Sequence, residues 1–244
     1  MASKTKKATK HRGRPKISAP ELDPLDATSD EPIDKQVYQA VRRALMSGAL
    51  PPGGRLSSRS IASALGVSPM PVREALKRLD ADGVIHSAAK SGFRVHDLTA
   101  AEYREILTIR LQIESLLIRE AAKHITREEA DQATWLVERM KASQDWRHVL
   151  QYNYQLHFLA YKAANMPYAL SITENIWLRV GPAFHRLPEK VTLTLSLQHL
   201  YNLVKALRKN DPVAAEKCLR SDIELNSIAL LQPLTEREAD QSAA

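Results

Sequence analysis

The segment IASALGVSPMPVREALKRL, residues 61–79, constrains the fold of this chain more than any other segment. It predicts two short helices joined by a tight turn, in which Gly66 supplies the turn and Ser68 caps a second helix that has Pro69 at its first position. That second helix carries one stripe of apolar residues at i, i+3, i+4 and i+7, which predicts a buried face. The stripe is Val72, Ala75, Leu76 and Leu79.

The flanking residues complete a larger motif. Upstream, residues 34–48 predict an amphipathic helix that is closed by glycines and prolines. Downstream, the run VIHSAAKSGFRVHDL contains two short segments rich in β-forming residues around a Ser-Gly turn, which predicts a β-hairpin. Helix, helix, turn, helix and hairpin in this order predict a winged helix-turn-helix over residues 34–99. In such a domain the second helix of the motif faces base edges of DNA.

These residues resemble a known family. The runs SGALPPGGRL, IASALGVSPMPVREALKRLDADGVI and SGFRV resemble the DNA-binding domain of the GntR family of bacterial transcriptional regulators. The downstream run LTIRLQIESLLIREAA resembles the start of the FCD ligand-binding domain of its FadR-like branch. The resemblance implies a set of DNA contacts on the two helices and at the wing tip: Arg59, Ser68, Met70, Arg73, Ser91 and Gly92.

Two features modify this DNA-binding interpretation. Lys77 lies further along the outer face of the second helix, where a basic side chain is expected to meet a phosphate. Pro69 stands where many family members have an arginine that reads a guanine, so the operator can differ from the family's common short palindrome.

Positive charge is concentrated where DNA would be touched. The formal net charge is +7, and residues 1–16 alone carry seven Lys and Arg and no acid. Within them Arg12-Gly13-Arg14-Pro15 resembles an AT-hook, which lies in the narrow minor groove of A·T-rich DNA. The alternative is a generic basic tail that adds salt-dependent, sequence-blind affinity. Both alternatives place Arg12 and Arg14 on DNA.

The first 33 residues are expected to be disordered, because they have no periodic apolar pattern. Residues 17–33 carry five acids and no base. This acidic stretch is expected either to fold back on the basic tail or on the winged helix, or to act as a solubilising linker.

From residue 100 onward the chain has no strand-like alternation. It predicts about six antiparallel helices over residues 100–232, followed by a disordered tail over residues 233–244. The fold class is therefore mainly α, with an N-terminal winged helix-turn-helix and a C-terminal all-α helical bundle. A bundle of this length can enclose a cavity, and a small-molecule effector is expected to bind there.

Four polar residues of the bundle are placed like the metal ligands of the family. Asn153 and His157 are four apart on one helix face, and His199 and Asp222 follow on later helices. The family has an Asp at the first position and a His at the last. The resemblance implies a Zn²⁺, Ni²⁺, Mn²⁺ or Fe²⁺ ion with open positions for a ligand carboxylate. The alternative is that the histidines are ordinary core or surface residues.

Arg110 and Glu114 match the family's Arg and Glu at the start of the bundle. Arg110 can bind an organic-acid effector bidentately, or it can pair with Glu114 as a structural ion pair. Three other histidines have no partner spacing and are expected at the surface: His124, His148 and His185.

Together these features predict a bacterial repressor that acts as a homodimer in the cytoplasm, associated with the nucleoid, on a short palindromic operator in double-stranded DNA. One alternative is an architectural A·T-rich DNA binder with a vestigial effector domain. Another is a metal-dependent hydrolase using His157, His199 and Asp222. Because HExxH and GxSxG motifs and a placed general base are lacking, no enzyme is expected. No apolar run approaches the ~18 residues that span a bilayer, so no membrane partner is expected.

Overall fold

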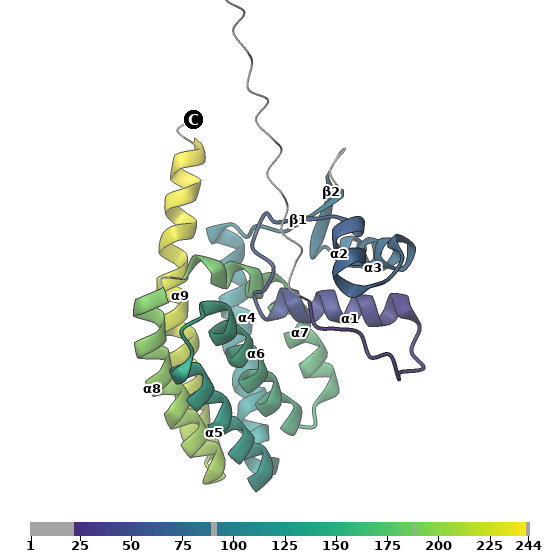
Figure 1. Ribbon diagram of the computed structural model, residues 1–244. Helices are drawn as coiled ribbons and strands as arrows, with labels where there is room; N and C mark the ends of the chain where they lie inside the picture. The colour runs from purple at the N-terminus through teal and green to yellow at the C-terminus, as the bar shows by residue number, and fades with distance from the viewer. Residues whose placement is uncertain (1–21, 89–91, 188, 243–244) are drawn as a thin grey trace, which may run out of the picture.

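The computed structural model describes residues 22–88, 92–187 and 189–242, apart from the side chains of residues 189–196 and 241–242. The described residues form a winged helix and a helical bundle, which confirms the predicted fold class (Figure 1). The elements of the winged helix are α1 (Ile33–Met46), β1 (Arg55–Leu56), α2 (Ser58–Leu65), α3 (Pro69–Ala81), β2 (Ile85–Ala88) and β3 (Gly92–Val95). Those of the bundle are α4 (Ala100–His124), α5 (Arg127–Ala142), α6 (Trp146–Ala163), α7 (Pro167–Ala183), the 3-10 turn η1 (Phe184–Arg186), α8 (Glu189–Arg208) and α9 (Pro212–Ser242).

The wing is a three-stranded antiparallel sheet with strand order β1-β3-β2. The predicted hairpin is present as β2 and β3, in which Ala88 lies opposite Gly92. The sequence did not predict β1, because two residues are too short to leave an alternating pattern. Leu56 of β1 pairs with Phe93 of β3 and ties the wing to the start of α2.

The start of α3 differs from the prediction. Ser68 occupies the N-cap position, but its side chain makes no capping hydrogen bond. A capping oxygen accepts from the N–H of the second or third helical residue, and Pro71 at the third position has no N–H. In α2, by contrast, Ser57 accepts from the Ser60 N–H at 3.3 Å. In the bundle, Thr126 and Glu129 form a capping box at the start of α5, as expected from a Thr and a Glu three residues apart before a helix.

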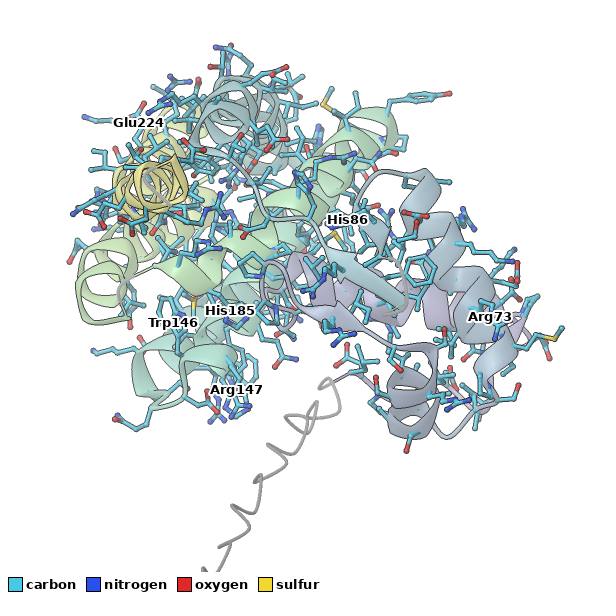
Figure 2. The ribbon with its side chains drawn as sticks, turned by 90° about the horizontal axis from the view of Figure 1, so that it is seen from above. Arg73, His86, Trp146, Arg147, His185 and Glu224 are labelled. Carbon is cyan, nitrogen blue, oxygen red and sulfur yellow. The ribbon has the colours of Figure 1, made fainter. Side chains whose placement is uncertain are left out.

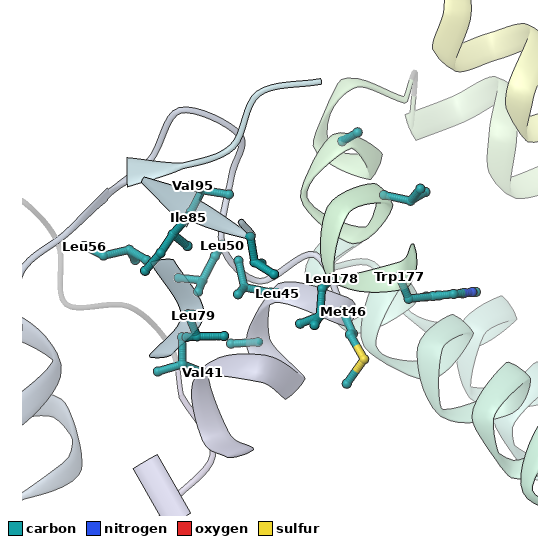
Figure 3. Close-up of a cluster of buried hydrophobic side chains, with 14 of the residues drawn as sticks. Val41, Leu45, Met46, Leu50, Leu56, Leu79, Ile85, Val95, Trp177 and Leu178 are labelled. Carbon is teal, nitrogen blue, oxygen red and sulfur yellow. The ribbon is translucent and has the colours of Figure 1, made fainter. Parts of the chain in front are cut away.

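The winged helix and the bundle share one hydrophobic core. Val41 and Leu45 of α1 belong to the same buried cluster as Trp177 and Leu178 of α7 (Figure 3). A second cluster fills the bundle between α4, α5, α6, α8 and α9. In Figure 1, α1 lies between the bundle and the helices α2 and α3. Because burial of apolar surface stabilises a packing arrangement, α7 fixes where the winged helix sits.

The approach of α7 to α1 is close enough to require glycine. A Cβ atom on Gly181 would lie 2.3 Å from the Leu45 carbonyl oxygen and 2.6 Å from that of Met46. Backbone atoms cannot yield as the end of a flexible side chain can. Gly181 therefore lets the last turn of α7 touch the end of α1.

Residues 22–32, which the sequence predicts to be disordered, contact the folded part of the protein. Leu22 and Leu25 pack against the shared core, and Asp23 pairs with Arg43 of α1 at 3.3 Å. This part of the acidic stretch therefore folds onto the winged helix, which is one of the predicted alternatives. Residues 1–21 lie outside the described part of the chain.

The last helix also continues past its predicted end. Instead of a disordered tail from residue 233, α9 runs to Ser242 with Pro233 inside it. Proline removes one helical hydrogen bond and costs about 3 kcal/mol in a helix interior. Leu230 and Leu234 on either side are fully buried in the shared core, which offsets that cost. No helix in the described residues is long and apolar enough to cross a membrane.

Candidate DNA-binding face and effector pocket

One face of α3 is buried and the other is open. The predicted stripe from Val72 to Leu79 lies in the core, at most 2 % exposed. Met70, Arg73 and Lys77, spaced three and four apart, are all exposed, and Met70 is 76 % exposed. Figure 2 shows Arg73 at the edge of the winged helix that is farthest from the bundle. This outer face of α3 points away from the bundle and is accessible to a large partner.

The neighbouring candidate residues extend this face. Arg59 of α2 and Ser68 at the start of α3 are exposed as well. Lys77 lies 2.9 Å from the Glu74 carboxylate, an exposed pair that solvent screens. Arg78 differs from these side chains, because its guanidinium stacks 4.1 Å from the ring centre of Tyr38 on α1.

The wing candidates lie only partly within the described residues. Gly92 has φ +84°, and a Cβ there would lie 2.7 Å from the Leu56 carbonyl oxygen. The backbone therefore requires glycine at this position whether or not DNA is bound. Ser91, Arg12 and Arg14 lie outside the described residues, so their DNA contacts stay predictions.

The bundle contains a small, partly open pocket between α4, α5, α6, α7, η1 and α9. Its volume is about 30 Å³, which is room for roughly two water molecules. The polar lining is Arg110, Asn153, His157, Asp222 and Asn226. The apolar and aromatic lining is Met140, Trp146, Val149, Leu150, Trp177, Phe184, Leu187 and Ile223.

Arg110 is engaged in a buried ion pair. Its Nε and Nη2 donate to the two carboxylate oxygens of Glu114 at 2.6 and 3.3 Å, and both side chains are at most 3 % exposed. Burial opposes the charged form of Arg110, but the Glu114 carboxylate raises the pKa of Arg110 above its usual value. Arg110 therefore makes the ion pair with Glu114 that is one of its two predicted roles.

The ion pair continues into a chain of hydrogen bonds. The Tyr161 hydroxyl donates to Glu114 Oε2 at 2.6 Å and lies 2.9 Å from His157 Nδ1. Burial and the Glu114 charge raise the pKa of Tyr161 well above its usual value, so its proton stays in place. His157 Nε2 lies 3.6 Å from the Asp222 carboxylate, which also accepts from the Asn226 amide at 3.2 Å.

These residues do not assemble the four-ligand metal site that the resemblance implies. Asn153, His157 and Asp222 line the pocket, whereas His199 of α8 is absent from its lining. Among the described residues no three His, Cys, Asp or Glu side chains gather to hold a metal ion. One imidazole and one carboxylate that already face each other, with amides beside them, are a poor donor set for these ions. The metal ion therefore stays a prediction.

Sequence reasoning missed two donors in this pocket. The indole Nε1 atoms of Trp146 and Trp177 are buried and have no hydrogen-bond partner in the described part of the protein. A tryptophan in a helix is usually interpreted as a core residue. Only the structure shows that these two line a pocket and lack acceptors. A buried N–H without a partner costs about 1–3 kcal/mol.

The wall of the pocket also contacts the winged helix. Trp177 lines the pocket from α7, and two polar residues of the same helix reach the other domain. Glu174 pairs with Arg42 of α1 at 3.0 Å, and Arg179 donates to the Asp82 carbonyl at the end of α3 at 2.9 Å. Movement of α7 would therefore displace its contacts with both α1 and the end of α3.

The linker between the domains is held by residues next to the pocket and by α9. Arg186, one residue before the pocket-lining Leu187, donates to both oxygens of Asp97 at 2.8 Å. Arg237 of α9 pairs with the same carboxylate and donates to the Leu98 carbonyl at 2.7 Å. This contact exists only because α9 continues beyond residue 233.

His185 is not the surface histidine that the sequence predicts. It lies in η1, is partly buried, and is close to the backbone of Gly48, which follows α1. Burial lowers the pKa of His185 below its usual value. In Figure 2 His185 lies between the two domains. His124 and His148 are exposed, as predicted.

Comparisons with known proteins agree with this arrangement. Residues 33–95 match the model of bacterial regulatory proteins of the gntR family, and residues 105–225 match the FCD domain. The chain is 30 % identical over 203 residues to the HTH-type transcriptional regulator McbR of Escherichia coli K12, covering 81 % of this chain and 92 % of that protein. It is 26 % identical to the HTH-type transcriptional repressor RspR of the same strain, covering 80 % and 87 %.

Solved structures give the same result. E. coli McbR/YncC superposes with a TM-score of 0.77 at 28 % identity, covering 83 % of this chain and 99 % of that one. A GntR regulator from Rhodococcus sp. RHA1 shares the fold with a TM-score of 0.67 at 23 % identity, covering 82 % and 97 %. The architectural and hydrolase alternatives gain no support from these relatives, which are named as transcriptional regulators. The chain therefore belongs to the GntR family of bacterial regulatory proteins, with a GntR winged helix followed by an FCD domain.

Proposed function

We propose that this protein is a homodimeric transcriptional repressor whose binding to a palindromic operator changes when a small effector enters the bundle pocket. The single observation that carries the DNA-binding part is the open face of α3 with Met70, Arg73 and Lys77 on one side. The relatives named as repressors support the direction of regulation. Because its target is chromosomal DNA, we place the protein in the bacterial cytoplasm, on the nucleoid.

Dimerisation is supported by an exposed apolar stripe on the bundle. Ile109 and Leu116, seven residues apart on one face of α4, are 43 % and 44 % exposed. Ile228 on the adjacent α9 is 73 % exposed. Two-fold symmetry of the protein would match a palindromic operator. Leu116→Asp should turn a dimer into a monomer in sedimentation analysis, and a wild-type protein that sediments as a monomer contradicts the proposal.

The DNA-binding face is tested with an operator selected from random duplexes by the purified protein. Arg73→Ala should weaken operator binding by about 1–3 kcal/mol with little change on random DNA, because a base contact is lost. Lys77→Ala should weaken binding to all DNA alike and lower the salt slope by about one, because a phosphate contact is lost.

A matched control comes from the far end of the bundle. Arg127 is exposed at the start of α5, and the whole length of α4 separates it from the winged helix. Arg127→Ala should leave both affinities unchanged. Equal losses for Arg73→Ala on operator and random DNA, or no loss, contradict the assigned role of α3.

The effector is proposed to act through α7 and η1. Both segments line the pocket and both touch the winged helix or its linker, at Glu174, Arg179 and Arg186. The pocket has room for roughly two water molecules, so a larger ligand is expected to press on these walls. A shift of α7 would change the relative placement of the two winged helices and thus their fit to the half-sites.

The carboxylate effector and the metal ion expected from the sequence remain separate proposals. A carboxylate at Arg110 would compete with Glu114 for the guanidinium. Metal analysis of the purified protein tests the ion directly. Retention of about one divalent ion per chain, lost in His157→Ala and Asp222→Ala, would support it.

A further inference from the structure

Two hydrogen-bond donors among the residues that line the pocket lack acceptors in the described part of the protein. Nε1 of Trp146 and Nε1 of Trp177 are both buried at the pocket and find no acceptor among the described protein atoms. Trp177 is 1 % exposed. In Figure 3 its ring extends from the shared core and its nitrogen points away from the winged helix, toward the bundle. The large majority of buried N–H groups in native proteins donate a hydrogen bond to protein, water or ligand.

The charged groups of the pocket are already matched. Arg110 is paired with Glu114, and Asp222 faces His157 and accepts from Asn226. If His157 is protonated, this set has no net charge, and if it is neutral the set carries one negative charge. A ligand carboxylate would in either case add an uncompensated buried charge, which is costly. The charge balance therefore disfavours an anion, and two indole donors require an acceptor, so a neutral molecule with an acceptor oxygen meets both conditions.

We propose that Trp146 and Trp177 bind the effector by donating their indole N–H groups to oxygen acceptors of a small, neutral, carbonyl-bearing molecule with an apolar body. This rests on the proposed function, in which the pocket takes the effector. The carbonyl end occupies the space of roughly two water molecules. The apolar body lies against the side chains that make up the rest of the lining, among them Met140, Phe184 and Leu187.

The same contact explains how the ligand would be sensed. Trp177 belongs to α7, and Trp146 is the first residue of α6. A carbonyl held by both indoles joins the two helices. Its apolar body displaces Phe184 and Leu187, which flank Arg186, the residue that holds Asp97 of the linker. Binding of a carbonyl compound by the two indoles would therefore change the position of the winged helix relative to the bundle.

The experiment uses the intrinsic fluorescence of the full chain. The protein has three tryptophans, and the third, Trp135, is 53 % exposed on α5. Titration of Trp135→Phe with butyramide, butyrate and butylammonium compares a neutral acceptor, an anion and a cation of similar size. Butyramide should change the fluorescence with saturation. Butyrate should bind at least tenfold more weakly at pH 7, and butylammonium should not bind.

Removal of one N–H tests the donors directly. Trp146→Phe and Trp177→Phe each keep an aromatic ring and lose only the donor and part of its area. Each should weaken butyramide binding about tenfold, as measured by calorimetry, whereas Trp135→Phe should leave it unchanged. Thermal unfolding checks that each variant is folded. Trp146 is less buried than Trp177, so Trp146→Phe serves as the test if Trp177→Phe is unfolded.

The outcomes separate this inference from the proposed function. If butyrate binds more tightly than butyramide, or if both Trp→Phe variants bind butyramide as the wild type does, the indole assignment is overturned. The same holds if none of the three probes binds. If butyramide binds through the indoles but leaves operator affinity unchanged, the assignment stands and the effector role of the pocket fails. Loss of operator binding by Arg73→Ala is independent of both.

Discussion

Gly181→Ala places a single methyl group between the two domains. The new Cβ would lie 2.3 Å from the Leu45 carbonyl oxygen, while ordinary contact begins at 3.4 Å, so α7 and α1 must separate by about 1 Å. Overpacking of this kind costs about 1–3 kcal/mol. Alanine recovers up to about 1 kcal/mol of helix propensity over glycine. With the full gain subtracted, the net expectation is a loss of up to about 2 kcal/mol in the free energy of unfolding.

Urea unfolding followed by circular dichroism measures that loss, and fluorescence anisotropy on the selected operator measures its effect on DNA binding. Gly66→Ala is the matched control. Gly66 has φ +67° and no atom within 4 Å of an added Cβ, so its cost is conformational only, about 1–2 kcal/mol. Gly181→Ala should also weaken operator binding, because α1 moves. If Gly181→Ala is as stable as the wild type and binds the operator equally well, the close approach of α7 to α1 does not position the winged helix.

Three further changes test contacts of the pocket and the linker. Asp97→Asn removes the carboxylate shared by two arginines. Fluorescence anisotropy should show that affinity for the full operator falls about tenfold (~1.4 kcal/mol), while affinity for a single half-site stays unchanged. Equal losses on both DNAs would refute the idea that Asp97 positions the winged helix. Glu114→Gln leaves the charge of Arg110 buried without its partner, so urea unfolding should show a loss of about 3–5 kcal/mol, whereas a loss below about 1 kcal/mol would mean that the pair is dispensable. Burial lowers the pKa of His185 in the folded protein below its ordinary value of 6.5. The contribution of neutral His185 to stability is therefore present above pH 6.5 and is lost as the pH falls through the folded pKa. His185→Gln should flatten the fall in unfolding free energy between pH 7 and pH 5, and an unchanged slope would contradict this.

Local residue patterns were enough to predict the parts of this protein that depend on neighbouring residues. The buried stripe of α3, the hairpin of the wing and the capping box of Thr126 and Glu129 follow from periodicity and turn chemistry within a few residues. The exposure of Arg73 and Lys77 follows from the same periodicity, because the face opposite a buried stripe is open. Family resemblance then added the role of that face.

The contacts between residues far apart in the chain are determined by the packing of the helices. The sequence left Arg110 with two possible partners; in the structure it pairs with Glu114, which also accepts from Tyr161, and binding of an effector by Arg110 stays a prediction. Family resemblance grouped His199 with His157, but a resemblance in sequence does not determine which helix face meets a cavity in this chain, and His199 is absent from the lining.

The ends and junctions of the chain depend on tertiary contacts in the same way. A proline at position 233 predicts a helix end locally, yet burial of Leu234 and the contacts of Arg237 with the linker carry α9 onward. The donors of Trp146 and Trp177 likewise have no sequence signal. Whether a buried indole N–H meets an acceptor depends on helices α4 to α9 together, and local sequence pattern holds no information about that arrangement.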